Sequence, residues 1–359
     1  GTAGWPEAHH TASRACWASN ARLSRSMDSG KAGLTVAVRD IIGLIDEELS
    51  RVEREISLEW MASVDAITMI GNYLRSSGGK RLRPALVILT SKLVGDGGES
   101  AIRLGAVVEM IHSATLVHDD VIDGARTRRG RASTNIMWGN HTAVLAGDWL
   151  YMQAFQIALR ERDFRVLDLL INVTQSMVEG ELLQLKYLGS MTVTEAEYMD
   201  LVDRKTAGLF SVAARLGAVV AGADPATEEK LGEYAWNVGM AFQLIDDVLD
   251  FTAHESVLGK PVGNDLWEGK VTLPLIYALE SSDEADRNMV ATVLADRSYE
   301  RVPFERILDL IIRRGGVERV RQRARAFTEK ARSIIGEFPE SPYQRALYAV
   351  TELVTERDY

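Results

Sequence analysis

Three carboxylates lie close together in the stretch HDDVID, which ends an apolar run at His118–Asp123. On a helix, Asp119 and Asp123 would project from one face about 6 Å apart along the axis, and Asp120 would point about 100° away. Like charges at this spacing repel, so a positive partner must offset them. Two carboxylates one turn apart suit Mg²⁺, which takes one or two carboxylates and leaves its other positions to water and substrate phosphates.

The same spacing recurs in QLIDDVLDF, where Asp246, Asp247 and Asp250 end a second apolar stretch. One such motif is equally well explained as a solvated helix end. Two of them, each followed by a long loop that carries Lys or Arg, favour a metal site.

Two basic stretches accompany the acidic motifs. In GGKRLRP, Pro84 suits the first turn of a helix, which places Lys80, Arg81 and Arg83 at its start. Cations are unfavourable at this positive end of the helix dipole unless an anion joins them, so the stretch predicts a phosphate site, with a surface salt-bridge cluster as the alternative. The second stretch, ARTRRGR, is no nucleic-acid surface, because aromatic residues do not interleave and the chain has a net charge of −10.

Further polar residues lie on apolar helices. Gln243 shares a face with the second aspartate motif, and His112 lies two turns before the first. Lys205 and Thr206 interrupt a long apolar helix, where a snorkelling lysine and a back-bonded threonine are the alternatives to a site. These residues together predict a cavity with a charged rim and an apolar depth, suited to an amphiphile with a diphosphate head.

The elements that position these residues are predicted to be helices. Apolar residues recur at intervals of three and four from Val36 onward and almost nowhere alternate with a period of two, which predicts an all-α chain. Thr194 and Glu197 form a capping-box signature. The connections 124–140 and 252–269 are longer than the others. No repeat or Pro/Ser-rich linker divides the chain, so we expect one helical domain over residues 35–359.

Residues 1–34 differ in composition, with Arg and Lys outnumbering acidic residues. We expect them to be a tag, a leader or a transit-peptide remnant that is poorly ordered and outside the fold. The single cysteine, Cys16, suits a reducing compartment. The most apolar stretch, 209–223, is too short to span a bilayer cleanly. We therefore expect a cytoplasmic protein, or a mitochondrial or plastid one if a transit peptide is present.

The ordered series GGKRLRP, HDDVIDGARTRRG, KTAGLF and QLIDDVLDF…GKPVGNDLWEGKVTLP resembles the motif series of the all-trans polyprenyl diphosphate synthases. The resemblance runs from about Val36 to the C-terminus. It implies the isoprenoid synthase fold, which is a single large bundle of antiparallel helices around a central cavity. It also implies a homodimer and three Mg²⁺ ions, no nucleic acid, and at most a peripheral contact with membrane for product release.

The resemblance assigns roles to individual residues. Three aspartates would bind Mg²⁺: Asp119, Asp123 and Asp246. Three others would support them: Asp120, Asp247 and Asp250. Isopentenyl diphosphate would be held by Lys80, Arg83, His112 and Arg129. The allylic diphosphate would be held by Arg128, Lys205 and Lys260. Two residues would lie near the developing allylic cation: Thr206 and Gln243.

The implied reaction condenses isopentenyl diphosphate repeatedly with an allylic diphosphate such as farnesyl or geranylgeranyl diphosphate. Mg²⁺ and cationic side chains would stabilise the charge on the departing diphosphate, which is also the implied proton acceptor. Water must be excluded from the allylic cation.

Product length depends on the residues four and five before the first aspartate, which form a wall beneath the allylic site in this family. Here they are Thr115 and Ala114, both small, where short-chain synthases tend to carry aromatics. We therefore predict an octaprenyl to decaprenyl product, for the side chain of ubiquinone or menaquinone. Close helix packing is the other reason for small residues there, and a farnesyl or geranylgeranyl diphosphate synthase is the alternative function.

Two rival functions share parts of the pattern. A class I terpene cyclase has the first aspartate motif, but the second motif DDVLD argues against it. A non-catalytic partner subunit of a heteromeric synthase tends to lose aspartates from these motifs, and all six are present here.

Overall fold

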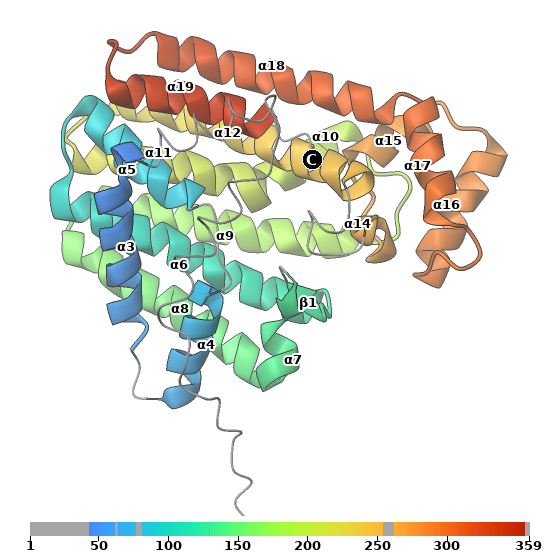
Figure 1. Cartoon of the computed structure of the whole chain (residues 1–359), viewed down its shortest axis with the longest axis horizontal. Helices are drawn as coiled ribbons and strands as arrows, with labels where there is room; N and C mark the ends of the chain where they lie inside the picture. Colours follow the sequence, from blue (N-terminus) through green and yellow to red (C-terminus); the bar gives the residue numbers. More distant parts are fainter. Residues whose placement is uncertain (1–42, 62–63, 77–80, 129, 254–261, 356–359) are drawn as a thin grey trace, which may run out of the picture.

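The computed structural model describes residues 43–61, 64–76, 81–128, 130–253 and 262–355. The described chain is a bundle of α-helices, which confirms the predicted all-α class (Figure 1). The domain boundary predicted at residue 34 lies outside the described residues. In chain order the elements are α3 (Asp46–Glu59), α4 (Asp65–Ser76), α5 (Leu82–Val94), α6 (Gly98–Ile122), β1 (Thr127–Arg128), β2 (Arg131–Ala132), α7 (Thr134–Trp138), α8 (Asn140–Ala158), η2 (Leu159–Glu161), α9 (Phe164–Tyr187), α10 (Glu195–Val202), η3 (Asp203–Ala207), α11 (Gly208–Val220), α12 (Pro225–Thr252), α14 (Asn264–Trp267), α15 (Leu273–Glu280), α16 (Glu284–Asp296), α17 (Phe304–Arg313), α18 (Gly316–Gly336) and α19 (Pro342–Thr355).

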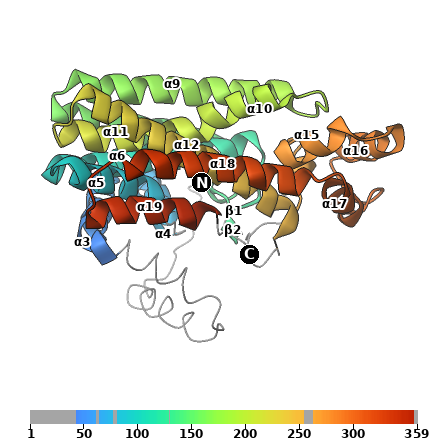
Figure 2. The ribbon, with the colours of Figure 1, turned by 90° about the horizontal axis from the view of Figure 1, so that it is seen from above.

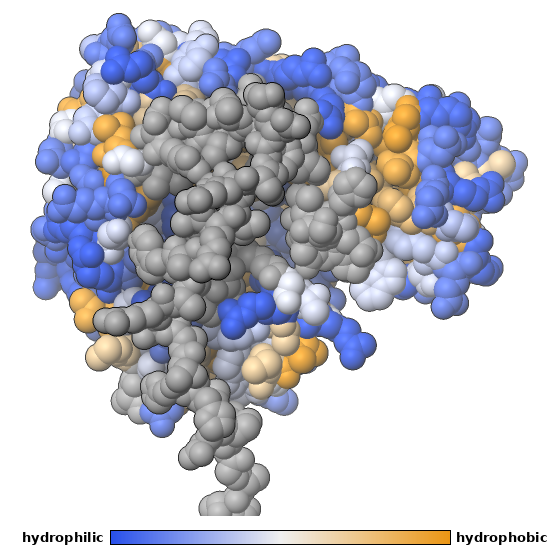
Figure 3. All heavy atoms as spheres, in the orientation of Figure 1, coloured by the Kyte–Doolittle hydropathy of each residue, from blue (hydrophilic) through white to orange (hydrophobic). Residues whose placement is uncertain are grey.

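The long helices run side by side through the body of the bundle. Helix α11 packs against α5, α6, α9 and α12, and α12 packs in turn against α18 and α19. Figure 2 shows this order from above, from α9 at one edge to α18 and α19 at the other. The shorter helices α15, α16 and α17 extend the bundle at one end (Figure 1). The face seen in Figure 3 is mostly hydrophilic, with hydrophobic residues in separate groups.

Small residues allow the central helices to approach closely. A Cβ added to Gly217 on α11 would overlap Thr90 Oγ1 and Val87 O on α5. Thr90 Oγ1 donates across this contact to Ala214 O at 3.0 Å. The glycine therefore fixes how α11 crosses α5, and α11 in turn positions the segment that precedes it.

Local signals set several helix ends. The predicted capping box is confirmed, because Thr194 Oγ1 accepts from the Glu197 N–H at 3.3 Å and Glu197 Oε2 accepts from the Thr194 N–H at 2.9 Å. Helix α12 begins at Pro225, after Asp224 accepts a hydrogen bond from the Thr227 N–H at 2.8 Å. These caps satisfy backbone groups that a helix start leaves without intrahelical partners.

The two long connections contain local structure that the sequence did not predict. In the first, Thr127 pairs with Ala132 and Arg128 with Arg131 in a two-stranded hairpin, which α7 follows. In the second, α14 lies between the described residues 262 and 271. Both segments are short and rich in Gly and charged residues, so they carry too few apolar positions to show a periodicity.

One of the described helices, α6, is long and apolar enough to cross a membrane by length and composition alone. Its apolar window is 72% buried inside the bundle, as in the core helix of a globular protein. The same helix carries the first aspartate motif at its C-terminal end.

Candidate active site

A cavity of about 690 Å³ lies among α5, α6, α9, α10, η3, α11, α12, α14 and the residues that follow α14. It combines charged groups with apolar side chains such as Leu116, Phe210 and Phe242. The predicted site residues that line it are Arg83, His112, Thr115, Asp119, Arg128, Lys205, Thr206, Gln243, Asp246 and Asp247. Four predicted residues are described but do not line it: Ala114, Asp120, Asp123 and Asp250. Lys80, Arg129 and Lys260 lie outside the described residues.

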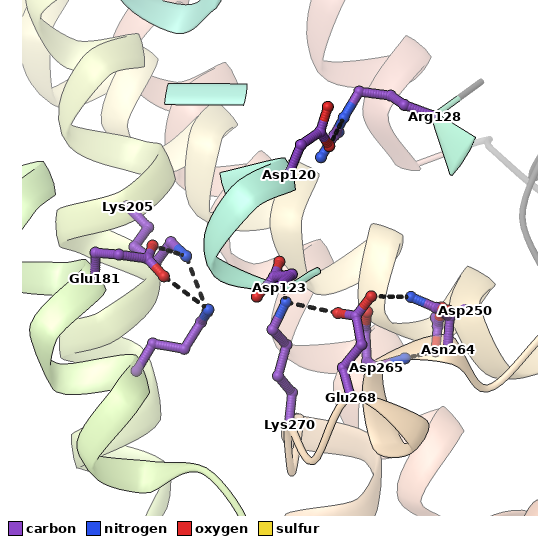
Figure 4. Close-up of polar contacts among 11 residues, drawn as sticks. Asp120, Asp123, Arg128, Glu181, Lys205, Asp250, Asn264, Asp265, Glu268 and Lys270 are labelled. Atoms are coloured by element: carbon purple, nitrogen blue, oxygen red, sulfur yellow. Dashed lines mark hydrogen bonds and ion pairs between the residues drawn. The ribbon is translucent and has the colours of Figure 1, made fainter. Parts of the chain in front are cut away.

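The first aspartate motif divides between two directions, as its helical spacing predicts. Asp119 lines the cavity, whereas Asp120 is buried and accepts a hydrogen bond from Arg128 Nε at 2.6 Å (Figure 4). Burial raises the pKa of Asp119 to about 6, against the opposing charge of Lys205. Asp119 is thus a carboxylate whose negative charge is only partly compensated by the protein.

Asp123 ends the motif at the C-cap of α6 and has a cationic partner from a distant segment. Lys270 Nζ donates to Asp123 Oδ2 at 2.7 Å and to Glu268 Oε2 at 2.7 Å. Lys270 also lines the cavity. The ammonium therefore offsets part of the charge that the three aspartates bring together.

The second aspartate motif presents Asp246 and Asp247 to the cavity but holds them differently. Asp247 is buried and accepts hydrogen bonds from the Tyr198 hydroxyl and, at 3.0 Å, from Gln243 Nε2. Burial raises the pKa of Asp247, and the two hydrogen bonds act in the opposite direction. Asp250 is buried, and its Oδ2 accepts from the Asp265 N–H at 3.2 Å. Asp247 and Asp250 thus brace the end of α12.

Lys205 and Thr206 lie in η3, a π-helical turn between α10 and α11. Lys205 forms an ion pair with Glu181 and donates to Gln184 Oε1 at 2.9 Å. Thr206 Oγ1 donates to Gln243 Oε1 at 2.9 Å. A π turn widens the helix locally and is frequent at functional sites. Here it brings two consecutive side chains to the cavity.

The basic stretch at the start of α5 contributes two described arginines, which have different partners. Arg81 has a left-handed backbone, with φ of 48°, and forms ion pairs with Glu53 and Glu109. Arg83 lines the cavity, with its guanidinium carbon 4.7 Å from the centre of the Phe210 ring. Arg81 therefore ties α5 to α3 and α6, and both Arg81 and Arg83 line the cavity.

The carboxylates fit a hard divalent cation. Oxygen ligands of this kind suit Mg²⁺ or Ca²⁺, and Asp119, Asp246 and Asp247 all line the cavity. Among the described residues, no three His, Cys, Asp or Glu side chains converge enough to hold a metal ion by themselves. This arrangement suits a Mg²⁺ ion that takes few protein ligands and completes its shell with water and phosphate oxygens.

Some residues of the site were not predicted. Tyr198, Glu181, Gln184 and Lys270 line the cavity or contact residues that do. Glu181 and Gln184 were detectable as polar interruptions of the apolar helix α9. Lys270 lies in the quoted stretch GKPVGNDLWEGK, but nothing in its spacing points to Asp123.

Comparison with known proteins identifies the family of the chain. Residues 64–311 match the family described as polyprenyl synthetase. The octaprenyl diphosphate synthase of Haemophilus influenzae is 35% identical over 324 residues, which cover 90% of this chain and 98% of that protein. The all-trans-nonaprenyl-diphosphate synthase (geranyl-diphosphate specific) of Rhodobacter capsulatus is 34% identical over 89% of this chain and 98% of its own.

The fold has solved relatives as well. A polyprenyl synthase from Caulobacter crescentus, complexed with calcium and isoprenyl diphosphate, matches with a TM-score of 0.86 and 34% identity, over 90% of this chain and 98% of that one. This match confirms the predicted isoprenoid synthase fold. The chain therefore belongs to the polyprenyl synthetase family, the trans-prenyltransferases that make polyprenyl diphosphates.

Proposed function

We propose that the chain is a Mg²⁺-dependent synthase that condenses isopentenyl diphosphate repeatedly with an allylic diphosphate to give a long all-trans polyprenyl diphosphate. The observation that carries this proposal is the cavity itself, where Asp119 and Asp246 face the same space as Lys205 and Arg128. Carboxylates for metal ions and cations for phosphate oxygens are what two diphosphate substrates require.

Each group has a part in the proposed reaction. Mg²⁺ bound at Asp119, Asp123 and Asp246 would neutralise charge on the departing diphosphate. Lys205, held by Glu181 and Gln184, presents its ammonium to the allylic diphosphate. Arg83 and His112 line the same cavity and would hold isopentenyl diphosphate.

The paired side chains of Thr206 and Gln243 suit a developing cation. Thr206 donates its hydroxyl proton to Gln243 Oε1, so the lone pairs of its oxygen are left to face positive charge. The neighbouring aromatic rings of Phe210 and Phe242 lie 5.4 Å apart at the cavity and help to exclude water.

The long product is supported by the small residues beneath the first aspartate motif. Thr115 lines the cavity and satisfies its hydroxyl by donating to His112 O at 2.7 Å on its own helix. Ala114 is fully buried beside it. A chain of eight to ten prenyl units would extend past these residues between the apolar helices, and its expected use is as a quinone side chain.

A homodimer is supported by an apolar surface on neighbouring helices α8 and α9, which we call the α8–α9 stripe. Its exposed members recur every seven residues within two runs, one on α8 and the following η2 turn and one on α9: Leu145, Met152 and Leu159, then Phe164, Ile171, Val178 and Leu185. Phe164 is 83% exposed. An exposed apolar stripe along two helices suits a second copy of the chain. Replacing Phe164 and Ile171 by Lys should give monomers by light scattering, and an unchanged dimer would contradict this interface.

The experiment that tests the function is a product analysis by chain length. Purified protein is incubated with Mg²⁺, labelled isopentenyl diphosphate and farnesyl diphosphate. A single long product supports the proposal. A product that stops after one addition would assign a short-chain synthase, and no product from folded protein would point to the partner-subunit function.

A further inference from the structure

Lys270 connects the two aspartate motifs, although it belongs to neither. Its Nζ lies 2.7 Å from Asp123 Oδ2, at the end of α6, and 2.7 Å from Glu268 Oε2 (Figure 4). The side chains of Lys270 and Asp123 are 17% and 18% exposed. This ion pair is therefore shielded from most of the water that weakens ion pairs on protein surfaces.

The segment that carries Lys270 is fastened to the second aspartate motif. The Gly263 N–H donates to Asp250 O at 2.7 Å, and the Asp265 N–H donates to Asp250 Oδ2 at 3.2 Å. Glu268 Oε1 accepts from Asn264 Nδ2 at 2.6 Å, which orients the second partner of the ammonium. The segment that is hydrogen-bonded to the end of α12 thus places the positive charge of Lys270 at the end of α6.

The ammonium is held in its charged form. Burial lowers the pKa of Lys270, but the charges of Asp123, Glu268 and Asp265 outweigh it and raise the pKa above its ordinary value. Lys270 therefore keeps its positive charge beside Asp123 throughout the physiological pH range.

A divalent cation and this ammonium compete for the same oxygen. Mg²⁺ binds carboxylate oxygens at about 2.0–2.1 Å. An ammonium already 2.7 Å from Asp123 Oδ2 takes a lone pair of that oxygen and repels a second cation at short range. A diphosphate offers the ammonium another partner, because phosphate oxygens accept strong charge-assisted hydrogen bonds.

We propose that Lys270 is the internal counter-ion of Asp123, so that a divalent cation gains this carboxylate only when a diphosphate draws the ammonium away. The inference rests on the proposed function, since it requires a metal ion and a diphosphate in this cavity. It also predicts an order of binding: a metal ion does not bind Asp123 before the diphosphate substrate is present, because Lys270 occupies that carboxylate.

The test measures Mg²⁺ affinity by calorimetry and melting temperature by fluorimetry, for the whole chain, with Mg²⁺ alone and with Mg²⁺ plus inorganic diphosphate. Lys270→Met removes the charge and is expected to bind Mg²⁺ about tenfold or more tightly than wild type without diphosphate. Wild type should be stabilised only by Mg²⁺ and diphosphate together. Lys270→Gln serves as a second variant if the methionine variant does not fold.

Two further variants sharpen the result. Lys92→Met is the matched control, because Lys92 forms a similar pair with Glu48 at 2.8 Å, with side chains 20% and 22% exposed, away from the cavity. It should bind Mg²⁺ as wild type does. Glu268→Gln removes the negative charge that competes with Asp123 for the ammonium. This variant should bind Mg²⁺ more weakly than wild type, whereas Lys270→Met should bind it more tightly.

Equal Mg²⁺ affinities for wild type, Lys270→Met and Lys270→Gln without diphosphate would overturn the inference. Failure of the proposed function is seen separately, in the product analysis of the wild-type protein. If the wild type makes polyprenyl product but the Lys270 variants show no gain in Mg²⁺ affinity, the proposed function holds and the counter-ion role of Lys270 is rejected.

Discussion

Replacing Asp119 by Asn should make the protein more stable and less active. The pKa of Asp119 is raised from 3.8 to about 6, with burial as the largest cause. At 1.36 kcal/mol per unit, the shift of about two units corresponds to at most about 3 kcal/mol of destabilisation by the ionised carboxylate, less where water reaches it. Asn has nearly the same shape as Asp but carries no charge, so the free energy of unfolding of the variant should be higher than that of wild type by up to this amount.

The sign of the pH dependence follows from the same shift. Near pH 4 the carboxyl is protonated in the folded state and still partly protonated in the unfolded state, so it costs the folded state little. As pH rises towards 6, the unfolded chain loses its proton first, and the free energy of unfolding falls; above 6 the cost is complete. Asp119→Asn should therefore exceed wild type in stability at pH 8 and approach it at pH 4.

The assay is urea unfolding at pH 8 and pH 4 without added metal, beside product formation with Mg²⁺. Activity should fall by about 10²-fold or more, because charge stabilisation at a reacting centre is of that size. Asp309→Asn is the control, since Asp309 is 75% exposed on α17 and should change stability by less than about 0.5 kcal/mol. An Asp119→Asn variant no more stable than wild type at pH 8, or equally stabilised at both pH values, would refute the reasoning.

Three other changes test other parts of the site. Ala114→Phe should shorten the product while turnover continues, by chain-length analysis; an unchanged length would remove Ala114 from the wall. Tyr198→Phe should lower the free energy of unfolding by about 1–3 kcal/mol, because it removes a hydrogen bond from buried Asp247; if its effect is the same in an Asp247→Asn background, the two residues are not coupled. Gly217→Ala should cost about 1–3 kcal/mol in unfolding experiments, because its Cβ would meet Thr90 and the α5 backbone; a stability equal to wild type would contradict this contact.

The division of the first aspartate motif could be predicted because helix geometry fixes side-chain directions. A run of apolar residues established the helix, and the spacing alone then placed Asp119 and Asp120 on different faces. The structure has Asp119 at the cavity and Asp120 paired with Arg128. The capping box at Thr194 was predictable for the same reason, since all its contacts are local.

The partners of these residues could not be predicted, because they come from distant segments. Lys270 lies 147 residues from Asp123 in sequence, and Tyr198 lies 49 residues from Asp247. Hydrophobic periodicity says which face of a helix is buried but not which neighbour covers it. The resemblance to a family assigned roles to residues that lie in its motifs, but it gave no role to residues outside them, such as Tyr198.

The π turn of η3 has a consequence for how this part of the chain can vary. A π turn holds about one residue more than an α turn, so a single deletion within 203–207 can be absorbed by closing it to an ordinary α turn. Gly217 would then keep its contact with α5, but the widened turn that brings both Lys205 and Thr206 to the cavity would be lost. A deletion elsewhere between the capping box at Thr194 and Gly217 has no extra residue to absorb it and would rotate the following helix by about 100°.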